Sequence, residues 1–414
     1  MNRFQNRYGS ARMRVLGPTL FLVGAGAWAV TEAAEPAYQA FFSGACPAAP
    51  GGSSLENVCL AAGTGISGDS ESSLNPSQAL AGNDQPLARA REKAAALQDD
   101  NKDGPDPAGT AAPALQLGPF SLLLNARGAW VDRDASGGER GYDGDTYSLE
   151  LGLDRRLSPR TVVGGFVSYA RDDLRFDGEA ATTFAPPSNA GSTQVDSASL
   201  VLFGAHSLSD AVYLEAAAGY GVGDYRFRRN AVAQDSNSTF TIPVRTRGDS
   251  DGRDYWVSAG AGYDLSRGAA SYGVFARTTW ARAQIDGYRE KDLNASGFNL
   301  IVGDAKRSSL TTTLGVRASR AVSFDWGVLV PQARVEYEHE FKNDPSSVSS
   351  AFVAVPGASF SPARDKPDQD WFNLAVGAQF ILPGGLMPYV EAEALLGQRN
   401  VERYRLLLGL RSEF

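Results

Sequence analysis

Residues 117–414 alternate between apolar and polar side chains with a period of two, and this alternation limits the possible folds more than any other feature. In 145–157, for example, one face of an extended chain collects Tyr147, Leu149, Leu151 and Leu153, and the other collects Ser148, Glu150, Gly152 and Asp154. Such alternation predicts strands with one apolar and one polar face. A soluble sandwich and a membrane barrel both satisfy it.

Strand length and the character of the polar face favour the barrel. The alternating stretches run for about 12–17 residues, whereas strands of globular proteins average about 5–6. Glycines and charges of both signs lie at strand centres, which suits a wet interior behind a lipid-facing apolar surface. We therefore predict an all-β fold, a 12-stranded antiparallel transmembrane β-barrel; an antiparallel soluble domain is the alternative.

The expected strands follow one another with connections of alternating length. They lie near 119–132, 145–157, 160–174, 194–207, 211–228, 252–265, 270–287, 306–320, 325–341, 368–381, 385–397 and 401–414. Tight turns are expected near 158–159, 209–210, 267–268, 324–325 and 383–385, and long polar loops near 175–193, 229–251, 288–305 and 342–367. Short turns at one rim and long loops at the other are typical of outer-membrane barrels.

Composition excludes several functions. The 414 residues carry 39 Lys+Arg against 47 Asp+Glu, a formal charge of −8, so binding of nucleic acid through bulk charge is not expected. Two cysteines and two histidines leave little room for a metal site, and we expect no metal, no cofactor and no catalytic residues.

The first 29 residues read as a signal peptide. Four arginines and no acid precede an apolar run at 15–29, which ends in Ala27-Trp28-Ala29, a small-x-small cleavage pattern. Cleavage after Ala33 or Ala34 and an uncleaved anchor are the alternatives. Removing the four arginines takes the formal charge from −8 to −12.

Residues 30–84 are expected to form a short, mostly irregular segment without a core of its own, because they are rich in Ala, Gly, Ser, Pro and Asp. Cys46 and Cys59 predict a small disulfide loop in an oxidising compartment; a lipid anchor on Cys46 is the alternative.

Residues 85–116 are expected to be a linker that contains one helix, over 85–99. Asp84 suits the N-cap and Pro86 the first turn. Arg89, Arg91, Glu92 and Lys93 lie in its middle and Asp99 and Asp100 at its C-terminal end, where acids oppose the helix dipole. The alternative is a linker helix that is exposed to solvent and has no specific role.

Together these elements resemble the autotransporter family over about residues 85–414. The last strand also resembles the family's assembly signal, in Tyr404, Leu406, Leu408, Leu410 and Phe414, although Ser412 stands where an apolar residue is usual. The resemblance implies that residues 117–414 form a barrel in the bacterial outer membrane, which exports its own N-terminal segment. It also implies that periplasmic chaperones and the barrel-assembly machinery take part in the assembly of this barrel. A closed barrel has no free edge, so a monomer is expected.

The resemblance also implies that the helix lies in the lumen and plugs it. Its basic residues would face Glu150, Glu215, Glu336, Glu391 and Glu393, and its terminal aspartates would face Arg403, Arg405 or Arg411. Arg317 and Arg334 complete the expected lumen wall.

Two other functions stay open. One is a channel or adhesin barrel that exports nothing. The other is an outer-membrane hydrolase, for which Gly68-Asp69-Ser70, His206 and His339 are weak candidates because no nucleophile lies at a suitable spacing from either histidine.

Overall fold

The computed structural model describes residues 46–53, 55–56, 59, 77–100, 120–136, 139–178, 184–185, 189–234, 241–342, 347–361 and 366–412. The chain divides into two compact units, residues 1–32 and residues 33–414, and every described residue belongs to the second. The predicted cleavage residues Ala27 and Ala29, the Gly68-Asp69-Ser70 fragment and Phe414 lie outside the described residues.

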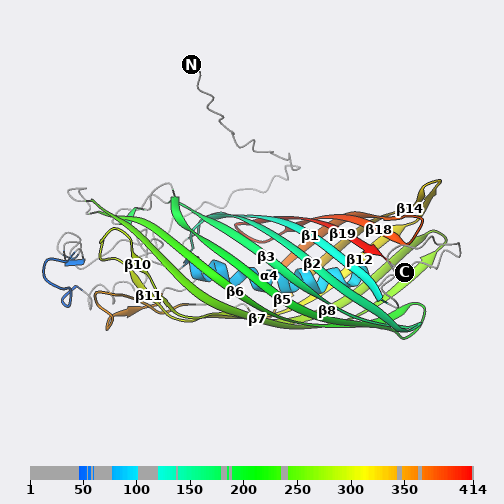
Figure 1. Ribbon diagram of the computed structural model, residues 1–414, viewed down its shortest axis with the longest axis horizontal. Helices are drawn as coiled ribbons and strands as arrows, with labels where there is room; N and C mark the ends of the chain where they lie inside the picture. The colour runs from blue at the N-terminus through cyan, green and yellow to red at the C-terminus, as the bar shows by residue number, and fades with distance from the viewer. Residues whose placement is uncertain are drawn as a thin grey trace, which may run out of the picture. The chain divides into compact units, whose positions relative to one another are not determined.

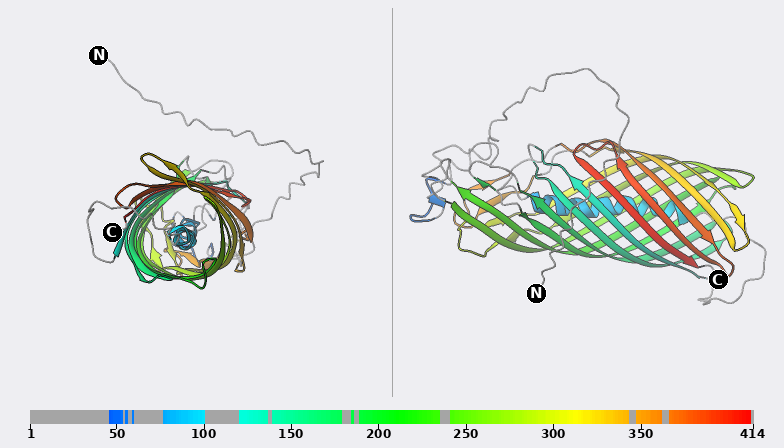
Figure 2. Two further views of the ribbon diagram at one scale, coloured as in Figure 1. Left: turned by 90° about the vertical axis from the view of Figure 1, so that its right-hand side faces the viewer. Right: turned by 90° about the horizontal axis from the view of Figure 1, so that it is seen from above.

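Twelve strands of the described part form a closed antiparallel barrel (Figure 1; Figure 2, left). They are β1 (Phe120–Arg133), β2 (Tyr142–Ser158), β3 (Thr161–Asp177), β5 (Asn189–Ser207), β6 (Val212–Gln234), β7 (Thr241–Arg267), β8 (Ala270–Ile285), β12 (Ala305–Arg320), β14 (Gly327–Glu340), β17 (Asp370–Ile381), β18 (Leu386–Leu396) and β19 (Val401–Ser412). Each pairs with its neighbours in this order, and β19 pairs with β1, from Leu122↔Ser412 to Arg133↔Val401. The predicted fold class and the twelve predicted strands are confirmed.

The barrel has its apolar side outward. On β2, Leu149, Leu151 and Leu153 are exposed, whereas Glu150 and Asp154 on the opposite face are buried. The same alternation runs through β8 and β17. Lipid supplies the apolar partner on the outside, and the lumen takes the polar side chains.

Glycines on the polar face make room for large inward side chains. A Cβ atom at Gly409 would lie 2.0 Å from the Tyr389 ring, and one at Gly219 would lie 2.2 Å from the Trp256 ring. The aromatic rings thus lie across the backbone of the neighbouring strand, which only glycine permits.

The expected loops at one rim differ from the structure. We expected a polar loop at 229–251, but β6 and β7 continue as a paired hairpin and leave only 235–240 between them. Inward residues on this extension, such as Ala231 and Val244, are buried. The alternation therefore continues past the membrane because a second apolar core lies there.

Short strands lie within the other long connections, and four of them contribute to that core. They are β4 (Phe184–Ala185), β9 (Tyr288–Arg289), β10 (Lys291–Asp292), β11 (Leu300–Val302), β15 (Ser350–Phe352) and β16 (Ser359–Phe360); β13 (Val322–Phe324) lies at the opposite, turn-side rim. Strands β9, β11, β15 and β16 contribute to that core and form a separate small sheet.

The helix α4 (Ser77–Asp100) is longer than the 85–99 helix that the sequence predicted. Asp84 is not its N-cap and Pro86 lies inside it, because residues from Ala79 onward are buried against the barrel and the packing outweighs the local cap signal. No helix among the described residues has the length and apolarity needed to cross a membrane.

A charge on the outer face of β2 should report the lipid contact. Leu151, at mid-strand, is 53% exposed. Leu151→Arg is expected to lower the free energy of unfolding from lipid vesicles by about 2–4 kcal/mol, whereas the same change near an interface costs about 0–1 kcal/mol. Leu208→Arg, in the exposed turn between β5 and β6, is the matched control. Equal losses in urea titrations of the two variants would contradict the inside-out arrangement.

Candidate functional site

The site is the lumen, with α4 inside it (Figure 2). The helix touches β3, β5, β6, β7, β8 and β12. At 1.5 Å per residue its 24 residues span about 36 Å, slightly more than the roughly 30 Å hydrocarbon layer. The helix is therefore long enough to follow the lumen through the whole membrane.

Small side chains let the helix fit. Leu87, Ala90 and Ala94 are buried in one apolar cluster with inward side chains of the wall, which include Phe166, Phe203 and Trp256. Toward the N-terminal end, Gly82 lies against Tyr225, and a Cβ there would sit 3.5 Å from its ring. The alanine-rich composition keeps the helix thin, and the aromatic rings of the wall fill the remaining space.

Two cations of α4 bind polar groups of the wall. Arg89 forms an ion pair with Asp172 of β3, whose side chain is 0% exposed and also accepts a hydrogen bond from Thr146 at 2.7 Å. The Lys93 ammonium donates to the Ser199 hydroxyl at 2.5 Å.

The other charged side chains of the helix that the structure describes also have partners. Arg91 lies over the Trp371 ring at 5.2 Å, a cation–π contact. Glu92 lies 3.7 Å from Arg403 and 3.8 Å from Arg405, and Asp84 pairs with Arg307 of β12. Asp99 and Asp100 end the helix, but their side chains lie outside the described residues.

The expected pairing between helix cations and wall glutamates is wrong in most positions. Most of these glutamates bind arginines of the wall instead, whose side chains lie within reach across the lumen lining. The pairs are Arg127–Glu150 at 3.0 Å, Arg277–Glu336 at 3.3 Å, Arg334–Glu391 at 3.0 Å, Arg334–Glu393 at 3.1 Å and Arg405–Glu393 at 2.7 Å. Glu215 lies beside Gly260 of β7, where a Cβ would sit 2.6 Å from its carboxylate.

The remaining predicted wall arginines also have wall partners. Arg317 binds Asp264 at 2.8 Å and stacks on Tyr213 at 5.2 Å. Arg411 lies 3.5 Å from Asp154. The predicted contacts of Asp99 and Asp100 with the wall arginines lie outside the described side chains. Arg403 and Arg405 approach the helix at Glu92.

Asp172, Arg277 and Ser199 are contact residues that the sequence reasoning missed. Arg277 donates to the Ala94 carbonyl at 3.3 Å, so it joins the helix to Glu336. All three fall inside predicted strands, and the alternation places Asp172 on the polar face with Ser168. The alternation of side chains along each strand could have identified these three residues as inward-facing, but it could not have identified their partners.

A second site lies beyond the rim with the long connections, and we call it the loop-end cap. It consists of β9, β11, β15, β16 and the outer ends of β6 and β7, together with the disulfide loop Cys46–Cys59. The predicted disulfide is present. Leu55, from within that loop, is 1% exposed in a cluster with Phe298, Phe352 and Phe360. The described residues of the disulfide loop thus share a core with the barrel loops, which agrees with the expectation that the 30–84 segment has no core of its own.

The interior of the loop-end cap is shielded from solvent. Arg229 and Glu290 form a buried two-point ion pair at 3.0 and 2.6 Å, and Arg229 also donates to the Phe298 carbonyl at 2.7 Å. Burial raises the pKa of the Tyr288 phenol well above its ordinary value; nearby Glu290 adds to the rise and Arg229 opposes it.

In the described residues, neither histidine is hydrogen-bonded to both a hydroxyl and a carboxylate, as a hydrolytic triad requires. His339 shares a hydrogen bond with Asp370 at 2.8 Å, and His206 shares one with Thr161 at 2.9 Å. In the same residues no group of three His, Cys, Asp or Glu side chains could hold a metal ion.

The terminal strand presents the predicted assembly residues to the outside. Tyr404 and Leu408 are exposed on the outer face of β19, and Leu406 and Leu410 are partly exposed. This face is continuous with the lipid-facing band.

The Arg89–Asp172 pair should anchor the helix. Removing one partner of a buried pair costs about 3–5 kcal/mol because the other charge stays buried alone. Asp172→Ala is therefore expected to speed hydrogen exchange in α4 at least 100-fold, and the double change Arg89→Met with Asp172→Leu should recover most of the protection. Asp173→Ala, which breaks only the exposed Arg171–Asp173 pair, should change it little. Equal exchange in both single variants would contradict the anchoring role.

Comparisons with known proteins agree with this geometry. The family model described as the autotransporter beta-domain matches residues 122–393. The translocator domain of autotransporter NalP from Neisseria meningitidis has a TM-score of 0.56 and 16% identity, over 80% of this chain and 98% of that one. Two curated relatives, esterase EstA of Pseudomonas aeruginosa and esterase EstA of Pseudomonas putida, are each 27% identical to this chain over 134 residues, or 32% of its length. The chain spans about a fifth of the length of these curated relatives. The chain therefore belongs to the autotransporter family, and its β-domain is an outer-membrane translocator barrel.

Proposed function

We propose that this barrel carries its own short N-terminal segment to the cell surface and holds it there, with α4 closing the lumen afterwards. The observation that supports this most is the path of the chain. The Cys46–Cys59 loop packs at the rim with the long connections, α4 occupies the lumen, and β1 begins at the opposite, turn-side rim, as its pairing with the end of β2 requires.

Such a path requires residues before α4 to pass through the barrel or the barrel to close around them. Long connections face the exterior in outer-membrane barrels and short turns face the periplasm. In this orientation the disulfide loop lies outside the cell. A leader at 1–29, cleaved after Ala29, accounts for entry into the periplasm.

Retention distinguishes this proposal from release of a free passenger. Leu55 belongs to the buried cluster of the loop-end cap, and the disulfide fixes the loop around it. Fully burying a leucine is worth about 1.5–3 kcal/mol. The disulfide loop therefore stays packed against the long connections at the cell surface.

We further propose the barrel-assembly machinery and periplasmic chaperones as partners in biogenesis, and a monomer in the membrane. The outward face of Tyr404, Leu406, Leu408 and Leu410 on the last strand supports the first. The β1–β19 pairing leaves no free barrel edge to join another copy, which supports the second.

The rival functions receive less support. A channel needs an open lumen, and α4 occupies it with matched charges. The name esterase belongs to relatives of which this chain spans about a fifth. In the described residues, no hydrogen bonds join His206 or His339 to both a hydroxyl and a carboxylate. We infer that the chain is not an enzyme.

Export is tested by an epitope tag inserted at residue 40. Externally added protease should remove the tag from intact cells. Access only after the outer membrane is permeabilised would contradict export and favour a barrel that displays nothing. Leu55→Asp should then expose the segment and raise its cleavage rate roughly tenfold or more, since the buried apolar contact is lost. Ala48→Asp, at an exposed position of the same loop, is the control and should leave the rate unchanged.

Closure of the lumen is tested in planar bilayers. Replacing residues 77–100 by a Gly/Ser linker of equal length should raise single-channel conductance well above that of the native chain, because the lumen wall is polar. A full-length chain with Arg171→Met, which changes only an exposed residue, should conduct like the native one. Equal conductance of the linker variant and the native chain would contradict closure by α4.

A further inference from the structure

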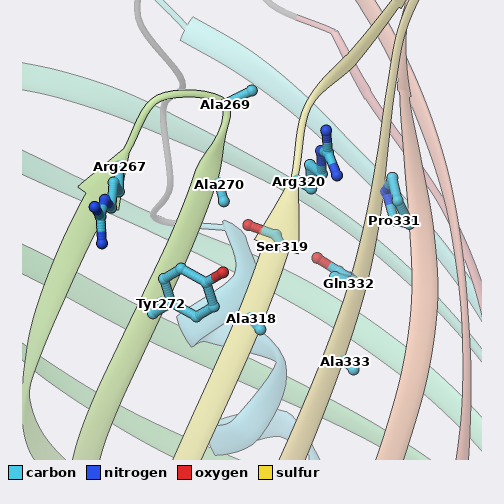
Figure 3. A pocket seen from close by; sticks show the side chains of 10 residues that line it. All are labelled: Arg267, Ala269, Ala270, Tyr272, Ala318, Ser319, Arg320, Pro331, Gln332 and Ala333. Atoms are coloured by element: carbon cyan, nitrogen blue, oxygen red, sulfur yellow. The ribbon is translucent and has the colours of Figure 1, made fainter.

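The outer surface of the barrel has a hollow at the turn-side rim, over β7, β8, β12 and β14 (Figure 3). Its volume is about 460 Å³. Around it, the outward residues Leu265, Tyr272, Val274, Val316 and Val335 are all exposed. The hollow therefore opens to the surroundings of the barrel and not to its lumen.

The strand register explains the hollow. Across one row, Tyr272 of β8 lies opposite Ala318 of β12, which lies opposite Ala333 of β14. The next row toward mid-membrane is Val274, Val316 and Val335. Two adjacent alanines thus form a floor between larger neighbours, with the Tyr272 ring as one wall.

Two arginines stand at the rim end of this floor. In the next row toward the turns, Ala270 pairs with Arg267 on one side and with Arg320 on the other. The two arginines lie on strands two positions apart, about 10 Å at the usual strand spacing. Within the described chain neither makes an ion pair, and nearby Asp264 is bound to Arg317.

The level of the arginines matches that of lipid headgroups. Phe324 and Trp326 stack at 5.2 Å in the turn before β14, and Trp326 lies 6.1 Å from Phe380. Aromatic residues gather at the boundary between the hydrocarbon layer and the headgroups. Arg267 and Arg320 lie on this rim. At this level their guanidinium groups contact the phosphates of lipid headgroups rather than the hydrocarbon layer.

We propose that this hollow is a binding site for one anionic glycerophospholipid of the adjoining leaflet. Arg267 and Arg320 donate hydrogen bonds to the phosphodiester from its two sides, since a planar guanidinium matches phosphate oxygens. One acyl chain lies on Ala318 and Ala333 against the Tyr272 ring and fills the hollow. The site needs only that the barrel lies in a bilayer, so it does not depend on export.

Native mass spectrometry of the delipidated full-length protein tests the site, with dioleoyl phosphatidylglycerol and dioleoyl phosphatidylcholine as probes of equal chain length. The native protein should retain phosphatidylglycerol in preference to phosphatidylcholine. Each of Arg267→Gln and Arg320→Gln should reduce its retention about fivefold, the effect of one cation at an anionic lipid surface. Arg160→Gln, an exposed arginine of the turn between β2 and β3, is the matched control and should change nothing.

A second variant tests the floor independently of charge. Ala318→Leu with Ala333→Leu fills the hollow with apolar side chains that a lipid-facing surface tolerates, so the barrel should still fold and retention should fall. Equal retention of both lipids, losses as large in the Arg160→Gln control, or full retention by the leucine variant would each overturn the proposal. Preferential retention of added lipopolysaccharide over phosphatidylglycerol would also overturn it. A folded band in unboiled gels verifies each variant.

Discussion

Pairing of β1 with β19 is the interaction on which the rest of the structure depends. In hydrocarbon no water can satisfy a backbone N–H or C=O group, so a sheet survives there only if it has no edge. The twelve strands meet this condition with a continuous register between the first and the last strand. Once the sheet closes, every strand has a lipid side and a lumen side, and the period-two pattern follows.

Closure also creates a confined polar space that must be filled and neutralised. Inward arginines and carboxylates are mostly matched within the wall, as in the Arg334–Glu391 and Arg405–Glu393 pairs. The helix contributes fewer contacts, and those are specific: Arg89 to Asp172, Glu92 to Arg403 and Arg405, Arg91 to Trp371. The wall is therefore largely self-compensated, and the helix fits a lumen that is already close to electrostatic balance.

The loop-end cap is a second filled space, beyond the rim with the long connections. Strands β6 and β7 continue beyond the apolar band, and their outer ends enclose a core that the connections and the disulfide loop complete. The described part of the disulfide loop thus packs into a core that the barrel supplies. The disulfide loop and the long β6–β7 hairpin therefore contribute to one core.

The sequence by itself determined the number of strands, their order, their inward and outward faces and the position of the tight turns, because alternation is a local property of the chain. It also indicated a helix ahead of β1 and the Cys46–Cys59 pair. Only the tertiary structure decided that α4 begins at Ser77, that 229–251 is a hairpin, and that Glu336 binds Arg277 rather than the helix. These features depend on register, on barrel curvature and on packing between residues far apart in the chain. A side chain's face can be read from its neighbours in sequence, but its partner is set by closure of the whole sheet.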